Sequence, residues 1–146
     1  MILTKSQIKK IKSVDVGGRG GKDLIIAEAL GHERVSTKFY DAVTKTGETV
    51  EYKKQQGSQF LDPYKFSQMS DEEKKIKILF FVHDGSRIKE IYQTDYSNLI
   101  DKMGYSDEDL KAIKDLYSRD CFVNRPNTQI KAELKLQEIK TFEKIL

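Results

Sequence analysis

The run Ile78–Val82 constrains the fold more than any other segment of this 146-residue chain. Its five residues are all apolar, and successive residues of a strand point to opposite faces of a sheet. Both faces of this strand therefore need apolar cover, which predicts a central strand buried on two sides. The Asp84-Gly85 pair that follows is a two-residue turn signal, so we expect a hairpin of residues 76–83 with residues 86–92.

Two helices are predicted before the first strand. Thr4 and Gln7 form a capping box for a short basic helix. A second helical run covers Lys22–Leu30 and is closed by Gly31. The glycine-rich segment 17–21 between them follows no strand and lacks the Gly-Lys-Ser/Thr ending of a P-loop, so we interpret it as a flexible joint.

Two more helices are predicted after the second hairpin. Ser106 begins a capped helix that runs toward Tyr117, and Asn127 or Thr128 can cap a last helix. The apolar residues of that last helix are Ile130, Leu134, Ile139, Phe142 and Ile145. Residues 130–136 also alternate between apolar and charged, so a strand is an open alternative there. The order of elements predicts an α+β fold, α/β-like in its mixed central sheet flanked by helices.

Composition sets the frame for function. The length predicts a single domain over residues 1–146, with a basic helix and joint at 1–21, a core at 22–92 and a helical C-terminal part at 93–146. One cysteine excludes an internal disulfide framework and a multi-cysteine zinc site, and favours a reducing, cytoplasmic compartment. No apolar run approaches membrane-spanning length, so no membrane partner is expected. A net charge of +3 permits a nucleic-acid partner without requiring one.

The segment 39–55 carries the residues with the most chemistry. Alternation along its second half places Glu51, Lys53 and Gln55 on one face of a strand. A three-residue loop at 45–47 pairs the strands so that Asp41 faces Glu51.

The turn type decides where Asp41 points. A two-residue turn at Thr46-Gly47 pairs Asp41 with Tyr52 instead, and turns it away from Glu51. The register of this hairpin is therefore a direct test of the site.

Two facing carboxylates beside a lysine describe a site for a hard divalent cation. Mg²⁺ prefers oxygen ligands and is commonly held by one or two carboxylates together with substrate phosphate. Lys53 can position or activate an attacking water, and Gln55 can hydrogen-bond that water or a phosphate oxygen. The competing interpretation takes Asp41, Glu51 and Lys53 as solvated charges paired across an exposed sheet face.

Asp41, followed after nine residues by Glu51-Tyr52-Lys53, resembles the bipartite motif of the PD-(D/E)XK nuclease superfamily. That superfamily includes type II restriction enzymes, Holliday-junction resolvases and some homing endonucleases. Its motif lies on a β-hairpin at the edge of a mixed sheet, after a helix that often supplies a further acidic residue, a role that Glu28 can fill here. Tyr40 stands where the family usually has a proline. The resemblance covers residues 22–92.

The resemblance implies a restriction-endonuclease-like fold and a DNA endonuclease that depends on Mg²⁺, with Mn²⁺ expected to substitute. Asp41 and Glu51 would hold the metal, with Glu28 as a third ligand, although a glutamate in a helix is ordinarily just a good helix former. Lys53 and Gln55 would assist catalysis. The residues expected to contact DNA are Lys9, Lys10, Arg19, Lys22, Ser58 and Gln59. For the basic helix, a solvated face is the alternative.

Three functional interpretations stay open at this point. A sequence-specific endonuclease of restriction or homing type is favoured, a Holliday-junction resolvase fits the same residues, and a non-catalytic nucleic-acid- or protein-binding module is the alternative outside the nucleases. Cutting both strands with so small a chain predicts a homo-oligomer, a dimer or tetramer. The stripe formed by Ile130, Leu134 and Phe142 is its candidate interface, with core packing as the alternative.

Overall fold

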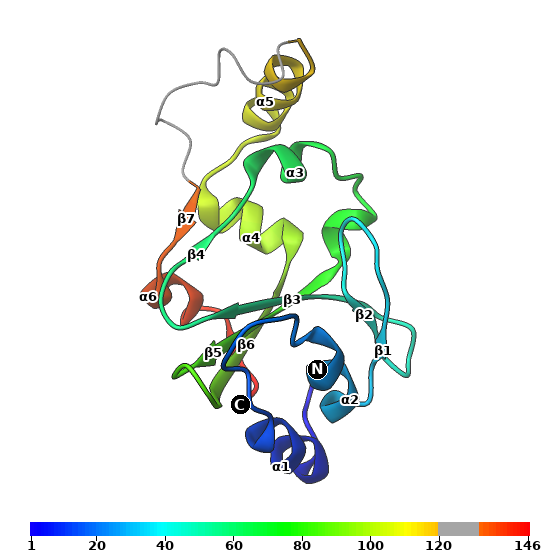
Figure 1. Ribbon diagram of the computed structural model, residues 1–146. Helices are drawn as coiled ribbons and strands as arrows, with labels where there is room; N and C mark the ends of the chain where they lie inside the picture. Colours follow the sequence, from blue (N-terminus) through cyan, green and yellow to red (C-terminus); the bar gives the residue numbers. More distant parts are fainter. Residues whose placement is uncertain (120–131) are drawn as a thin grey trace.

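A six-stranded mixed sheet forms the centre of the computed structural model, which describes residues 1–119 and 132–146 (Figure 1). In their order across the sheet, its strands are β1 (Glu33–Arg34), β2 (Ala42–Val43), β3 (Thr49–Gln55), β5 (Lys77–His83), β6 (Ile88–Asp95) and β8 (Glu143–Lys144). β3 and β5 run parallel, and the other neighbouring pairs of this sheet are antiparallel. The expectation of an α+β fold with a mixed, helix-flanked sheet is confirmed.

Helices cover the sheet, and a short ribbon lies beside it. The helices are α1 (Lys5–Ser13), α2 (Asp23–Leu30), α3 (Pro63–Ser67), α4 (Tyr96–Met103), α5 (Asp107–Arg119) and α6 (Leu136–Ile139), with a 3-10 turn at Glu73–Lys75. The ribbon pairs β4 (Gln59–Phe60) with β7 (Glu133–Leu134). Among the described residues, no helix has both the length and the apolar character that a membrane span requires.

β5 is covered on both faces, as its sequence predicts. Ile78 and Phe80 pack in one core with residues of α3 and α4, while Leu79 and Phe81 pack in a second core with residues of α1 and α2. All four side chains are fully buried. We call the two sides of the sheet the α3/α4 face and the α1/α2 face; Figure 1 shows them on opposite sides of β3.

Both N-terminal helices form where the sequence places them. Thr4 accepts a hydrogen bond from the Gln7 amide while the Gln7 side chain accepts one from the Thr4 amide, which completes the capping box of α1. α2 ends at Gly31, whose φ of 72° is left-handed. The start of the glycine-rich segment is anchored, because the Val16 amide donates to the Ser86 carbonyl at 2.8 Å.

The hairpin of β2 and β3 adopts the three-residue loop. Ala42 pairs with Val50, and the amide of Thr44 donates to the Glu48 carbonyl at 2.8 Å. Gly47 takes the left-handed position with φ of 85°. The two-residue alternative is therefore wrong, and this register brings Asp41 beside Glu51 just past the end of the ladder.

The second hairpin forms with a longer connection than the sequence suggests. β5 and β6 pair, but the chain reverses over residues 84–87, and their register shifts between Val82 and His83. The Asp84 carboxylate accepts from the Ser86 and Arg87 amides, and these bonds hold the pKa of Asp84 down to about 2. The turn is thus stabilised by its aspartate, but it centres on Gly85-Ser86 rather than Asp84-Gly85, because the Asp84 amide donates to the Arg87 carbonyl at 3.1 Å.

The C-terminal part departs from the expectation of a helical 93–146. In the described portion, the last predicted helix is limited to α6. β7 is a strand, as the alternative for residues 130–136 allowed, and β8 is a strand too; the predicted caps and Ile130 lie outside the described residues. Leu134 and Ile139 are fully buried, and the Phe142 ring stacks on Phe80 at 5.8 Å between centroids. Core packing therefore explains the described members of the stripe, which does not form an exposed helical interface.

Candidate active site

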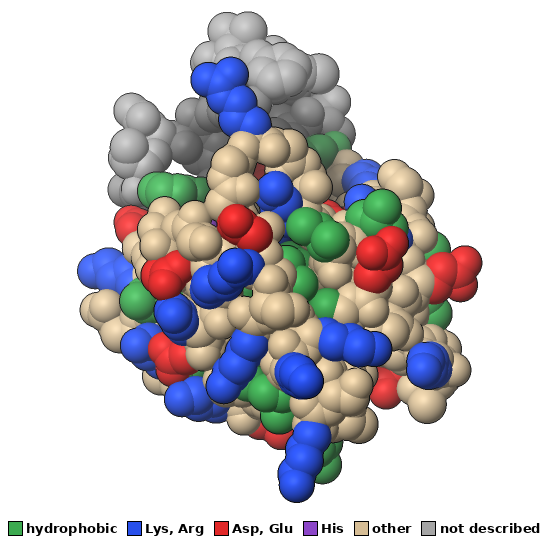
Figure 2. All heavy atoms as spheres, turned by 60° about the horizontal axis from the view of Figure 1, so that its bottom comes forward, with side chains coloured by type: hydrophobic (Ala, Val, Ile, Leu, Met, Phe, Trp, Pro, Cys, Tyr) green, Lys and Arg blue, Asp and Glu red, His purple; other side chains and the backbone are tan. Residues whose placement is uncertain are grey.

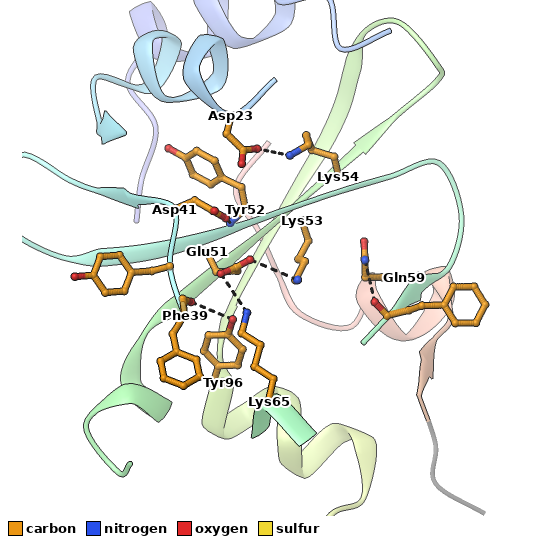
Figure 3. Close-up of polar contacts among 12 residues, drawn as sticks. Asp23, Phe39, Asp41, Glu51, Tyr52, Lys53, Lys54, Gln59, Lys65 and Tyr96 are labelled. Carbon is orange, nitrogen blue, oxygen red and sulfur yellow. Dashed lines mark hydrogen bonds and ion pairs between the residues drawn. The ribbon is translucent and has the colours of Figure 1, made fainter. Parts of the chain in front are cut away.

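β3 separates two groups of polar side chains, one on each face of the sheet (Figure 3). Alternation along the strand directs Glu51, Lys53 and Gln55 to the α3/α4 face and Tyr52 and Lys54 to the α1/α2 face. The first group contains the residues that the sequence identifies as a site.

Asp41 lies beside Glu51 at the point where the β2–β3 ladder ends. Its amide donates to the Val50 carbonyl at 2.9 Å, and its carboxylate accepts from the Tyr52 amide at 2.8 Å. The Asp41 side chain thus takes the place of a backbone acceptor and is fixed against β3. Its charge and a hydrogen bond to Glu51 both act on the Glu51 carboxyl.

Glu51 holds two ammonium groups, one on each carboxylate oxygen. Lys53 Nζ lies 3.4 Å from Oε1, and Lys65 Nζ of α3 lies 3.5 Å from Oε2. The Glu51 side chain is 10% exposed, and the two lysine side chains are 22% and 21% exposed. The result is a largely buried cluster of two carboxylates and two lysines.

Tyr96 forms the floor of this cluster. Lys65 Nζ sits 5.4 Å from the centre of the Tyr96 ring, and the Tyr96 hydroxyl donates to the Phe39 carbonyl at 3.2 Å. The ring is 1% exposed, so it presents a fixed apolar surface under the Lys65 side chain. Burial, followed by the negative charge of Glu51, raises the pKa of Tyr96, which stays a neutral donor.

Burial sets the electrostatics of the cluster. Desolvation raises the pKa of Glu51; Lys53 and Lys65 oppose this effect, and Asp41 adds to it. Desolvation also lowers the pKa of Lys65, against the attraction of Glu51. The cluster thus holds four charged groups in a largely buried position, where desolvation makes charge unfavourable. Such an arrangement is typical of functional sites.

Gln55 ends the row of residues on this face. It is 5% exposed, and neither its Oε1 nor its Nε2 has a hydrogen-bond partner among the described residues. Buried polar side chains normally have partners, so an unpaired amide on the same face of β3 as the charged cluster is a candidate for binding a ligand.

The α1/α2 face is built differently. Lys54 pairs with Asp23 at the start of α2, and the Tyr52 hydroxyl bonds His32 Nδ1 at 2.7 Å. Burial lowers the pKa of His32. Glu28 is exposed on α2, which packs on this face, so the structure does not bring it to Asp41 and Glu51.

Four of the six residues expected to contact DNA lie on α1 or in the segment that joins α1 to α2. Lys9, Lys10 and Arg19 are exposed and Lys22 is half-buried at the start of α2. Figure 2 turns this end of the molecule forward and shows its Lys and Arg side chains spread over the surface rather than gathered into one patch.

The other two expected DNA contacts follow β3. Ser58 is exposed, and Gln59 is half-buried, with its side-chain amide donating to the Phe60 carbonyl at 3.1 Å. Figure 3 shows Gln59 apart from the ion pairs of Glu51.

The sequence reasoning does not place Lys65 and Tyr96 at this site. Asp62 caps α3 and Pro63 is its first residue, a helix-start signal that was readable. That signal does not reveal which strand the helix covers, so the contact between Lys65 and Glu51 had no sequence signature.

Two cavities lie away from the cluster. One of about 480 Å³ is lined by residues that include Met1, Lys77 and Gln93, and one of about 290 Å³ lies between α3 and α5. Neither lining includes Asp41, Glu51 or Lys53. Among the described residues, no group of three or more His, Cys, Asp or Glu side chains gathers closely enough to hold a metal ion.

Comparisons with known proteins add no evidence about the site. No model of a known protein family matches the chain, and no curated protein sequence matches it either.

Proposed function

We propose that this chain is a Mg²⁺-dependent DNA endonuclease of the PD-(D/E)XK type, with a restriction-endonuclease-like fold. The observation that carries the proposal is the hairpin register, which sets Asp41 against Glu51 with Lys53 on the same carboxylate. The helix α2 ahead of the hairpin and the parallel pairing of β3 with β5 are consistent with that fold.

The chemical type of the candidate ligands fits a hard cation. Asp41 and Glu51 supply carboxylate oxygens, which lie side by side in the structure. Because the described part of the chain brings no third acidic side chain to this pair, phosphate oxygens and water must complete the shell, as Mg²⁺ commonly requires. When bound, Mg²⁺ or Mn²⁺ would lower the pKa of a bound water and offset charge on the phosphate.

The remaining steps belong to the protein side chains. Lys53 would orient the attacking water and stabilise the negative charge that develops on the phosphorus oxygens. Gln55 would accept from the water or donate to a phosphate oxygen. The water oxygen forms a bond to phosphorus as the bond from phosphorus to the 3′ oxygen breaks, so one product carries a 5′-phosphate and the other a 3′-hydroxyl that has taken up a proton.

The test is cleavage of supercoiled plasmid and of a four-way junction, with Mg²⁺ or with EDTA. We expect Asp41→Asn, Glu51→Gln and Lys53→Met each to lower the cleavage rate by about 100-fold or more, the size of effect that one electrostatic contact to a transition state has. EDTA should abolish cleavage by the wild type. Cleavage of the junction alone would identify a resolvase, and cleavage of plasmid at defined sites a restriction- or homing-type enzyme.

Lys54→Met is the matched control. Lys54 neighbours Lys53 on the same strand, is 28% exposed against 22%, and also pairs with an acidic side chain, but it points to the α1/α2 face. We expect it to cut like the wild type. Equal loss of cleavage in Lys53→Met and Lys54→Met, or cleavage that persists in EDTA, would contradict the proposed mechanism.

One observation favours a second candidate, a non-catalytic nucleic-acid- or protein-binding module. Both oxygens of Glu51 are already paired with lysines, as in a structural ion cluster. That candidate predicts no effect of divalent metal and no cleavage of either substrate. Mn²⁺ binding that disappears in Glu51→Gln separates the two, because a purely structural cluster does not bind metal.

A further inference from the structure

Lys65 is the second positively charged side chain that pairs with the Glu51 carboxylate, after Lys53. It comes from α3, ten residues beyond the end of β3, and reaches Glu51 Oε2 while Lys53 takes Oε1. The cluster of Asp41, Glu51, Lys53 and Lys65 is therefore neutral by formal charge before any metal enters.

This balance must change when a divalent cation binds. Adding two positive charges to a neutral, largely buried cluster is unfavourable unless a cation leaves Glu51 or an anion arrives. A phosphodiester brings one negative charge. We propose that Lys65 holds the place of the metal on Glu51 in the free protein and moves to the phosphate of bound DNA when the metal takes that oxygen. This inference rests on the proposed nuclease function.

The geometry selects Lys65 rather than Lys53 for this movement. Lys53 projects from the seven-residue strand β3, and at this position β3 is paired with the central strand β5. Lys65 projects from the five-residue α3, and its chain lies over the Tyr96 ring. A lysine stem can slide over an aromatic face while its ammonium group stays attracted to the ring. Lys65 can therefore leave Glu51 and still keep its apolar support.

The first test measures the affinity for Mn²⁺ alone, from the electron paramagnetic resonance signal of the free ion. We expect Lys65→Met to bind Mn²⁺ about fivefold to tenfold more tightly than the wild type, because the variant removes a positive charge that repels the metal at close range. Lys65→Gln should behave in the same way, and Lys65→Arg should keep the wild-type affinity because it keeps the charge. Lys54→Met, on the other face, should also keep it.

The second test measures binding of duplex DNA with Ca²⁺ in place of Mg²⁺. Here Lys65→Met should bind more weakly than the wild type, because the phosphate no longer has its lysine. Opposite signs in the two tests are the signature of the proposal. A merely structural lysine would weaken both affinities or neither.

The outcomes separate this inference from the proposed function. If Mn²⁺ binds the wild type but not Glu51→Gln, and Lys65→Met and Lys65→Gln bind it no more tightly than the wild type, the role of Lys65 is overturned and the nuclease proposal stands. If the wild type binds no Mn²⁺, both are overturned. Thermal unfolding of each variant shows that the affinities refer to folded protein.

Discussion

Gln55 is the residue whose environment is hardest to explain by stability. It occupies a buried position on β3, where apolar side chains are more usual. A buried amide without partners costs about 1–3 kcal/mol, since it has left water and formed no hydrogen bond in exchange. Such a cost is retained where the group serves a function, which is the ordinary trade between stability and activity.

We therefore expect Gln55→Met to raise the free energy of unfolding by about 1–2 kcal/mol, because it removes two unpaired polar atoms at nearly constant volume. The same variant should lower the cleavage rate. Urea denaturation measures the first effect, and the plasmid assay measures the second.

Gln93 provides the matched control. It is 7% exposed on β6, but its Nε2 donates to Glu143 at 2.8 Å and its Oε1 accepts from the N-terminal ammonium at 3.0 Å. Gln93→Met should destabilise the protein, because it removes both of these hydrogen bonds. A decrease of stability in both variants would mean that Gln55 is satisfied in solution and is an ordinary structural residue.

The β2–β3 hairpin is the element that the sequence specified best. The three-residue loop with a left-handed glycine was readable from residues 45–47, and the position of Asp41 relative to Glu51 follows from it by counting. A hydrogen bond from the Glu48 amide to the Thr44 hydroxyl adds to this local code. Local turn chemistry was sufficient here because the whole unit lies within about a dozen residues.

We expect Gly47→Ala to lower the free energy of unfolding by about 1–2 kcal/mol, the cost of a left-handed conformation for a residue with a Cβ. The cost is purely conformational, because a Cβ at Gly47 meets no atom within 4 Å. Gly57→Ala is the control, since Gly57 is equally open and has no left-handed φ. Equal urea midpoints for the two variants would show that the loop does not depend on this backbone conformation.

The C-terminal elements show where prediction from local sequence failed. Leu134 and Ile139 suit a helix by spacing, but each is held by a partner distant in sequence: β4 for the segment of Leu134, and the α3/α4 core for Ile139. α4 was missed although Asp95 caps it and Gly104 ends it, because both residues also suit a turn after a strand. Contacts with segments distant in sequence determine these elements, and such contacts cannot be predicted from a short window of sequence.

At the scale of the whole molecule, the sheet separates the basic N-terminal helix from the cluster around Glu51. α1 and α2 pack on one face, while Glu51, Lys53 and Lys65 lie on the other. A DNA duplex seated on Glu51 has to pass around the sheet before its phosphates reach Lys9 and Lys10.

This separation predicts that the contribution of α1 depends on DNA length. Removing one lysine–phosphate interaction lowers the slope of log affinity against log salt by about 0.9. For a duplex of roughly one helical turn, the double variant Lys9→Gln with Lys10→Gln should keep the wild-type slope, because the duplex cannot reach α1. For a duplex of roughly three turns, we expect the slope to fall by up to about 2. Fluorescence anisotropy in Ca²⁺ over a series of salt concentrations gives both slopes. An equal decrease on both duplexes would place α1 against the DNA that occupies the site, and an unchanged slope on both would leave its lysines as a solvated helix face.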